Sequence, residues 1–262
     1  MSTSTSASEQ TYTVPALEKG MQILEDLSSS PEPLSIIELA TRQKRSRNEI
    51  YRMVSCLETL GYITREESTK RYSLSLKLFQ MVNRHPAVNR LRTAASQPLQ
   101  ALAERINESC HLCVLDGDGL CVIAQASGNE RIRIAFQAGA RFDPLETCSG
   151  KLLLSELPED RRDSLLENSP LWQSMPSARR KSLLKDLGNV STQRLWEEDS
   201  VLRPGVRDIA AALGTSDTIH ATVTVAHLMH NPQAATSSQI KSHILETARD
   251  IQARLGIKPR DS

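Results

Sequence analysis

The chain has 262 residues, 39% of them hydrophobic, and 32 Lys and Arg against 31 Asp and Glu leave a net charge of +1. This balance excludes a protein that is basic throughout, so any contact with nucleic acid must be local. No run approaches the roughly 18 apolar residues of a membrane span, and the polar start "MSTSTSASEQTYT" has no features of a secretory signal. The five cysteines, an odd number, fit a reducing compartment, so we expect a cytoplasmic protein of two domains.

After a polar tail over residues 1–13, a dense helical pattern predicts a first domain over residues 14–75. The Ser/Pro breaker "SSSPEP" ends its first helix. Apolar residues at helical spacing predict the buried face of that helix: Leu17, Met21, Leu24 and Leu27.

Two capping boxes predict where the next two helices begin. Ser35 is followed three residues later by Glu38, with Leu34 and Leu39 placed to form a hydrophobic staple. Ser46 and Glu49 repeat the box before a helix that Gly61 ends. We expect this helix to bury Ile50, Val54, Leu57 and Leu60.

Two short strands, 62–65 and 71–73, follow across a polar turn. The order helix, helix, turn, helix, hairpin is typical of a winged helix-turn-helix. In such a domain the second helix of the motif enters the major groove of DNA.

The stretch "RQKRSRNEIYRM" carries five Lys and Arg and a single carboxylate over residues 42–52. A charge run is often only a solvated helix face, but this one has a single sign and follows helix-turn-helix spacing. We therefore predict that it contacts bases and phosphates. The predicted DNA-contacting residues are Arg42, Lys44, Arg45, Ser46, Arg47, Asn48, Tyr51, Arg52, and Lys70 and Arg71 in the wing.

A linker helix over residues 76–87, with a boundary near Pro86, precedes a second domain over residues 88–257 and a short tail over 258–262. Asp-Gly-Asp-Gly inside "HLCVLDGDGLCVIAQ" is a hairpin signal. Further elements are expected in chain order: a helix over 91–107, a strand over 131–136, and helices in "TCSGKLLLSEL" and "PEDRRDSLLENS". Polar connections then lead to "LRPGVRDIAAAL", a strand in "IHATVTVAHL" and a closing helix over 237–255. The fold class is α+β, an antiparallel sheet flanked by helices.

Taken together, these segments resemble the IclR family of bacterial transcriptional regulators. The resemblance covers nearly the whole chain and is most specific in "VPALEKGMQILEDL", "LETLGYI" and the Gly-Lys of "CSGKLLL". It implies a winged helix-turn-helix domain, a linker helix and a GAF-like domain that binds a small effector, in dimers or tetramers that often regulate catabolic operons. By this matching the effector pocket falls on Ile134, Cys148, Ser149, Glu198, Val206, Asp208 and Thr224.

The chain departs from the family pattern in the turn before its third helix. Lys44 stands where the family usually has a glycine, and Arg45 where it has a buried apolar residue. Glu49 replaces a common Ser or Thr. In the second domain, Asp208 stands where a smaller uncharged residue is common, which leaves the identity of the effector open.

The segment "TCSGKLLL" predicts a helix start capped by Thr147 or Ser149. Free backbone N–H groups there would receive a carboxylate or keto-acid oxygen, although an ordinary cap with nothing bound is equally compatible. Glu198 and Asp208 would instead favour a hydroxyl-rich or cationic group. A phosphate loop is excluded because Leu145 and Leu152 occupy the positions where it needs Gly and Ser or Thr.

An alternative function is a cysteine-dependent enzyme that uses Cys148 as a nucleophile. No spacing pairs this cysteine with a histidine, so a buried inert thiol is the expectation. In "CHLC", Cys110 and Cys113 lie three apart on a strand and face opposite sides, and "HLMH" offers no third ligand, so we predict no metal and no cofactor.

The sequence thus predicts a homodimeric or homotetrameric regulator, not an enzyme. Its partners would be a double-stranded DNA operator, with half-sites about 34–36 Å or a multiple of that apart, and a small-molecule effector. A winged helix that binds protein instead of DNA is the remaining rival.

Overall fold

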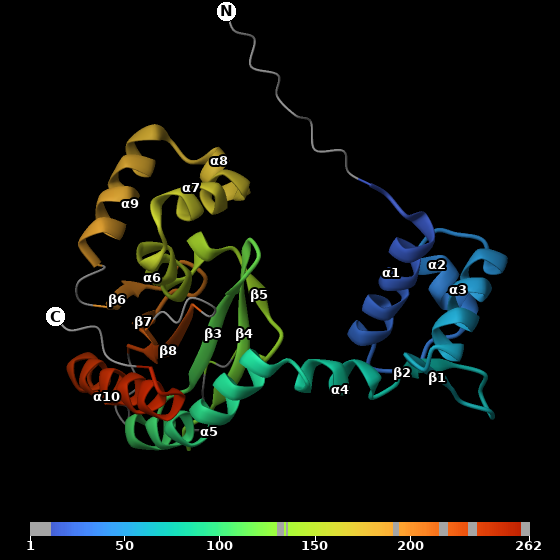
Figure 1. The fold of residues 1–262 in the computed structure, drawn as a ribbon, viewed down its shortest axis with the longest axis horizontal. Helices are drawn as coiled ribbons and strands as arrows, with labels where there is room; N and C mark the ends of the chain where they lie inside the picture. The colour runs from blue at the N-terminus through green and yellow to red at the C-terminus, as the bar shows by residue number, and fades with distance from the viewer. Residues whose placement is uncertain are drawn as a thin grey trace, which may run out of the picture. The chain divides into compact units, whose positions relative to one another are not determined.

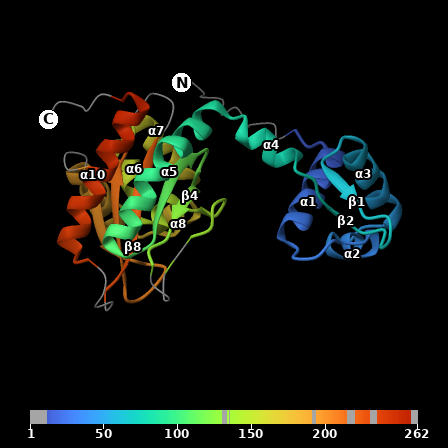
Figure 2. The same cartoon turned by 90° about the horizontal axis from the view of Figure 1, so that it is seen from below.

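The computed structural model describes residues 12–129, 134, 136–190, 194–214, 220–229 and 235–257. They form two compact units divided between His85 and Pro86 (Figures 1 and 2). No helix among these residues has the length and apolar character needed to cross a bilayer.

The N-terminal unit consists of helices and one small hairpin (Figure 1). In chain order its elements are α1 Pro15–Ser29, α2 Ile36–Arg42, α3 Arg47–Thr59, β1 Ile63–Arg65, β2 Tyr72–Leu74 and α4 Lys77–Asn83. β1 and β2 are antiparallel, with Thr64 opposite Ser73. This is the predicted winged helix-turn-helix order, which the structure confirms.

Both predicted capping boxes are present. The Ser35 hydroxyl accepts from the N–H of Glu38, whose carboxylate accepts from the N–H of Ser35 at 2.8 Å. Ser46 and Glu49 make the same pair of bonds, each 3.3 Å long. These local bonds set the first residues of α2 and α3.

The apolar stripe predicted for α1 is rotated in the structure. Gly20, Ile23, Leu24 and Leu27 are buried, whereas Leu17 is 62% and Met21 50% exposed. The predicted and the observed buried faces of α1 share Leu24 and Leu27, so the helical period fits both. The packing of α1 against α2 and α3 determines which face is buried.

The apolar stripe of α3 also ends earlier than predicted. Ile50 and Val54 are fully buried and Leu57 is half-buried. Leu60 lies beyond the last helical residue and is 51% exposed, because the chain leaves the core at Gly61, with φ +75°.

The C-terminal unit is built on a six-stranded antiparallel sheet in the order β5-β4-β3-β8-β7-β6. The strands are β3 Cys110–Asp116, β4 Gly119–Ala126, β5 Arg141–Phe142, β6 Leu195–Asp199, β7 Val206–Ala212 and β8 Ala221–Leu228. The predicted α+β class and the β3–β4 hairpin are confirmed, with Gly117 at φ +61° in the turn.

Helices cover both faces of this sheet (Figures 1 and 2). One face packs on α5 Pro86–Ile106 and α10 Ser237–Leu255, and the other on α6 Cys148–Glu156, which follows the short helix η1 Pro144–Glu146. Beyond α6 lie α7 Glu159–Asn168, α8 Pro170–Ser174 and α9 Ser177–Val190. Cys110 belongs to the core on the α5/α10 side and Cys113 to a cluster on the α6 side, so the two thiols do face apart.

Several elements differ from the prediction. α5 begins at Pro86 rather than at residue 91, and α8, α9 and β6 lie in a stretch expected to be polar connection. The strand predicted over 131–136 lies outside the described residues, apart from Ile134 and Phe136.

Candidate DNA interface and effector pocket

One face of α3 is exposed within the N-terminal unit. Ile50 and Val54 turn inward, and the opposite side presents four exposed polar side chains that make no hydrogen bond to any other described residue: Arg47, Asn48, Tyr51 and Arg52. Tyr51 is 57% exposed although it is aromatic. Guanidinium, amide and phenol groups on one helix face can read base edges and bind phosphates.

An ion pair fixes α3 against α1. Lys19 Nζ lies 3.0 Å from Glu49 Oε1. The hydrogen bond from Lys19, followed by those from Ser46, lowers the pKa of Glu49 to about 2. Glu49 therefore remains a carboxylate whose charge is directed to α1 and to the cap of its own helix.

The three cations ahead of α3 are all exposed: Arg42, Lys44 and Arg45. Lys44 has φ +52°, the left-handed conformation in which a glycine is usual. The turn thus holds a lysine in a backbone conformation that is strained for any residue but glycine. Arg45 is not buried, so it takes no part in the core of this unit.

The two predicted wing residues differ in their surroundings. Lys70 is exposed and lies 2.6 Å from Glu67 on the same turn. Arg71 is half-buried, and its Nη1 donates to Glu38 Oε2 and to the Pro33 carbonyl, each at 2.8 Å. Among the predicted DNA contacts, Arg71 is held by an ion pair to Glu38 on α2, whereas Lys70 pairs within its own turn and Ser46 caps α3.

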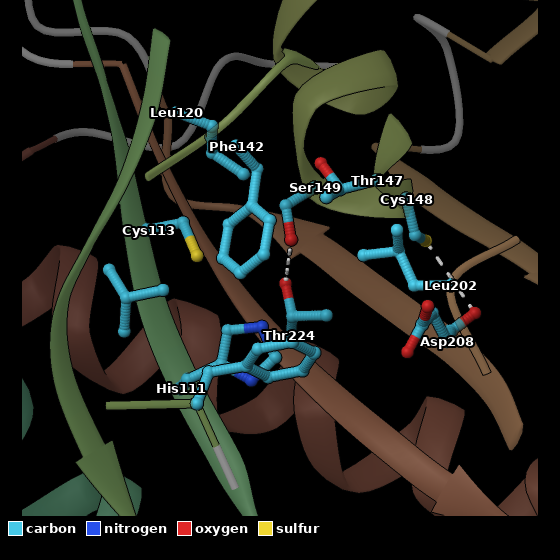
Figure 3. Close-up of a pocket in the computed structure, with 12 residues that line it drawn as sticks. His111, Cys113, Leu120, Phe142, Thr147, Cys148, Ser149, Leu202, Asp208 and Thr224 are labelled. Carbon is cyan, nitrogen blue, oxygen red and sulfur yellow. Dashed lines mark hydrogen bonds between the residues drawn. The ribbon is translucent and has the colours of Figure 1, made fainter. Parts of the chain in front are cut away.

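The C-terminal unit contains a cavity between the sheet and the start of α6 (Figure 3). Its volume is about 20 Å³, room for a single water, so any larger ligand requires its walls to move. Twelve residues line it: His111, Cys113, Leu120, Val122, Phe136, Phe142, Thr147, Cys148, Ser149, Leu202, Asp208 and Thr224.

Four of the seven predicted effector residues are among this lining: Cys148, Ser149, Asp208 and Thr224. The hydroxyls of Ser149 and Thr224 lie 2.6 Å apart and hold α6 to β8. Burial raises the pKa of Asp208, and a hydrogen bond from Ser200 opposes that effect.

The other three predicted residues are not part of the lining. Glu198 accepts from Lys151 Nζ at 2.7 and 2.8 Å and from Trp196 Nε1 at 3.3 Å. Val206 is buried in the sheet, and Ile134 is half-buried. The resemblance to the family places Glu198 in the pocket. The structure instead pairs its carboxylate with Lys151, so this carboxylate is already bound.

The first turn of α6 leaves donors free. The Thr147 hydroxyl accepts from the N–H of Gly150 at 3.0 Å, while the N–H groups of Cys148 and Ser149 have no partner among the described residues. Gly150 is required here because a Cβ would lie 2.2 Å from the Pro144 carbonyl oxygen. The helix start can therefore receive an anionic oxygen.

Cys148 is not an activated nucleophile. It is 1% exposed, and its Sγ lies 3.1 Å from the Trp196 carbonyl oxygen and 3.5 Å from that of Asp208, which both accept from the thiol. Burial raises the pKa of this thiol well above its ordinary value. No group of three or more His, Cys, Asp and Glu able to hold a metal occurs within the part of the chain that the structure describes.

Sequence reasoning did not single out the aromatic part of the pocket. The rings of His111 and Phe136 lie 4.9 Å apart, and Phe142 meets Phe136 edge-on at 5.4 Å. The guanidinium of Arg203 lies 4.6 Å from the centre of the Phe136 ring. The alternation of β3 could have placed His111 on the same face as Cys113, but not next to α6.

Comparisons with known proteins agree with this architecture. The model of the bacterial transcriptional regulator IclR C-terminal domain matches residues 86–253, and that of the IclR helix-turn-helix domain matches residues 16–67. The HTH-type transcriptional regulator KdgR of Escherichia coli (strain K12) is 30% identical over 205 residues, 77% of each chain. TtgV of Pseudomonas putida, an HTH-type transcriptional regulator, is 25% identical over 245 residues, 93% of this chain and 92% of its own.

Solved structures share the fold. The crystal structure of an IclR homolog complexed with 4-hydroxybenzoate, from Microbacterium hydrocarbonoxydans, superposes with a TM-score of 0.78 at 16% identity, covering 93% of this chain and all of that one. At this identity the likeness concerns the fold alone.

Proposed function

Because the chain belongs to the IclR family of bacterial transcriptional regulators, we propose that α3 binds an operator and that a small organic acid in the C-terminal cavity changes its affinity for that operator. The chain is a regulator with an effector-binding domain and not an enzyme. The exposed polar face of α3, whose side chains bond to none of the described residues, is the observation that carries the proposal.

Each exposed group on α3 has a natural partner on DNA. Arg47 can make paired hydrogen bonds to guanine and Asn48 to adenine, each worth about 1–3 kcal/mol of discrimination. The exposed ammonium and guanidinium groups of Lys44, Arg45 and Lys70 would neutralise phosphates, which sets the salt dependence of binding.

A dimer would present two copies of α3 to two half-sites. Large apolar side chains are exposed on two helices of the N-terminal unit: Val14, Leu17 and Met21 at α1, and Leu76, Phe79, Met81 and Val82 at α4. A soluble monomer seldom exposes so many apolar groups, and a second copy would cover them. Half-sites about 34–36 Å apart, or a multiple of this, would match such a dimer.

The donors at the start of α6 support an organic acid as the effector. A carboxylate would accept from the free N–H groups of Cys148 and Ser149 and meet the positive end of the helix dipole. A neighbour of the same fold was solved with 4-hydroxybenzoate, an acid of this class. A ligand that binds one conformer of the cavity better shifts the population of DNA-competent molecules.

DNA binding is tested with a labelled fragment of the intergenic DNA beside the protein's own gene, titrated by anisotropy over a salt series. We expect affinity to fall steeply with salt. Arg47→Ala should lose the preference for this fragment over random DNA, and Arg179→Ala, an exposed arginine on α9, should keep it. An unchanged preference in Arg47→Ala would reject the role of α3, and binding of protein but not DNA would favour the rival function.

Effector binding is tested by a thermal-shift screen of small carboxylic acids. A hit should be lost in Cys148→Tyr and in Thr224→Tyr, because both side chains would fill the cavity. A hit that survives both substitutions binds elsewhere.

A further inference from the structure

His111 is a buried side chain whose ring makes no hydrogen bond to another described residue, and its nitrogens are not among the fully enclosed unpartnered atoms, so the ring reaches the surface of the cavity. It lies on β3, is only 6% exposed and lines the cavity. Buried polar side chains are nearly always hydrogen-bonded, so an unpartnered imidazole that faces a cavity requires an explanation. A ligand that hydrogen-bonds to the His111 ring would provide this explanation.

Polar side chains form one side of the cavity, and His111 lies at one end of this polar edge. His111 stands directly opposite Thr224 in the β3–β8 pairing, and the Thr224 hydroxyl is 2.6 Å from that of Ser149. Figure 3 shows the imidazole beside Thr224, while Leu120 and Phe142 lie across the cavity. A ligand between these edges meets hydrogen-bonding groups along one side and apolar groups along the other.

The hydroxyls of Ser149 and Thr224 bond each other, so His111, whose ring contacts Phe136, is the member of this edge without a hydrogen-bond partner among the described residues. Burial lowers the pKa of His111 to about 4, so the ring is neutral near pH 7, with one donor and one acceptor nitrogen. A neutral imidazole binds a hydroxyl group in either direction without burying a charge. Asp208, also in the lining, would repel a second carboxylate.

We propose that His111 is a specificity-determining residue that binds a hydroxyl group of the effector, and that the effector is a hydroxylated monocarboxylic acid. The carboxylate lies at the start of α6 and the hydroxyl at the ring of His111. This inference rests on the proposed function, because it assigns the cavity to the effector.

Two matched pairs of acids test it, 4-hydroxybenzoate with benzoate and lactate with propionate, measured by calorimetry on the full chain. The wild type should bind the hydroxylated member of at least one pair about tenfold more tightly, the gain of one buried hydrogen bond. His111→Phe should bring the two members within about twofold of each other. His111→Gln, which keeps a donor and an acceptor, should retain part of the preference.

Thr222→Val is the matched control, since Thr222 on β8 is fully buried, its hydroxyl has no partner among the described residues, and it does not line the cavity. Its preference should equal that of the wild type. If His111→Phe does not fold, as judged by circular dichroism, His111→Leu makes the same test. A preference that persists in either variant, or equal binding of both members of each pair by the wild type, overturns the assignment of His111.

Operator binding measured in parallel separates this inference from the proposed function. If the preference depends on His111 but the acid leaves DNA affinity unchanged, the site stands and the regulatory proposal fails. If the wild type binds its intergenic DNA but prefers no hydroxylated acid, only the inference on His111 fails.

Discussion

Nη1 of Arg71 lies 2.8 Å from Oε2 of Glu38, the third helical residue of α2 and a member of its capping box. The same nitrogen donates to the Pro33 carbonyl, so the residue that precedes β2 is joined to the start of α2. This guanidinium therefore sets the position of the wing. Its neighbour Lys70, exposed at φ +57°, pairs only with the exposed Glu67 of its own turn and is the wing cation that can exchange this partner for a phosphate.

Replacing Lys70 and Arg71 separately should show which of them contacts a phosphate and which only positions the wing. Lys70→Met should make the plot of log affinity against log salt shallower by about 0.9, the value for one lost phosphate contact. Arg71→Met should lower operator affinity and leave that slope unchanged, because its charge is held by Glu38. A slope that changes equally in both variants would show that Arg71 also contacts phosphate.

The turn residue Lys44 combines strain with a useful charge. Because its φ of +52° suits glycine, Lys44→Gly should stabilise the N-terminal unit by up to about 1 kcal/mol in urea unfolding. The same change should weaken operator binding and make its salt dependence shallower. Lys44→Gln is the control, since it removes the charge and keeps the strain. If the glycine variant is less stable than this control, the turn has another conformation.

The winged helix-turn-helix could be predicted from sequence because its boundaries depend on local bonds. Ser35 with Glu38, and Ser46 with Glu49, are three residues apart and form wherever the chain turns into a helix. Which apolar residues are buried depends on distant partners instead. Met21 fits the helical period of α1 as well as Ile23 does, yet only Ile23 meets the core.

The pocket was predictable only in part for the same reason. A segment such as "TCSGKLLL" marks a helix start through its own residues, and Thr147 does cap α6. The sequence predicts Glu198 in the pocket, whereas the structure pairs it with Lys151. The two residues lie 47 positions apart, so no local sequence pattern indicates that they pair. His111 faces the cavity because β3 lies between β4 and β8, which is a property of the sheet order.

Acid should weaken the starts of α2 and α3. The pKa of Glu38 is lowered to about 2, first by its hydrogen bonds from Ser35 and then by Arg71, and that of Glu49 is lowered to about 2 by Lys19 and Ser46. A carboxylate with a lowered folded pKa contributes stability that is complete above its unfolded pKa near 4.5 and is lost as the pH falls toward 2.

The melting temperature of the wild type should therefore fall between about pH 5 and pH 2. Glu38→Gln with Glu49→Gln should be less stable at pH 7 and show a flatter profile across this range. A control with Glu25→Gln, on α1 and outside both boxes, should follow the wild type. Equal pH profiles of the double variant and the wild type would contradict the ionised caps.

His111 should make the C-terminal unit sensitive to a milder range of pH. Its folded pKa of about 4 lies below the unfolded value of 6.5, so the unfolded chain takes up the proton first and stability falls as the pH drops from 6.5 to 4. The loss is on the order of 3 kcal/mol. Asp208 opposes it because burial raises the pKa of its carboxyl, so the comparison of His111→Phe with the wild type isolates the imidazole. A steep loss that persists in His111→Phe would assign the titration to another group.

The five cysteines should differ sharply in their reactivity toward a thiol reagent at pH 8. Cys56 is exposed on α3, whereas Cys110, Cys113 and Cys148 are buried. Burial raises the pKa of Cys110 and Cys113 to about 12, and that of Cys148 well above its ordinary value, so their thiolates are scarce as well as inaccessible. The thiol of Cys56 should react rapidly and that of Cys121 more slowly, and the three buried thiols should react only after unfolding. Cys56→Ser should remove the rapid phase and Cys148→Ser should leave it unchanged. Rapid labelling that disappears in Cys148→Ser would instead reveal an activated thiol at the start of α6, and with it the enzyme that the geometry argues against.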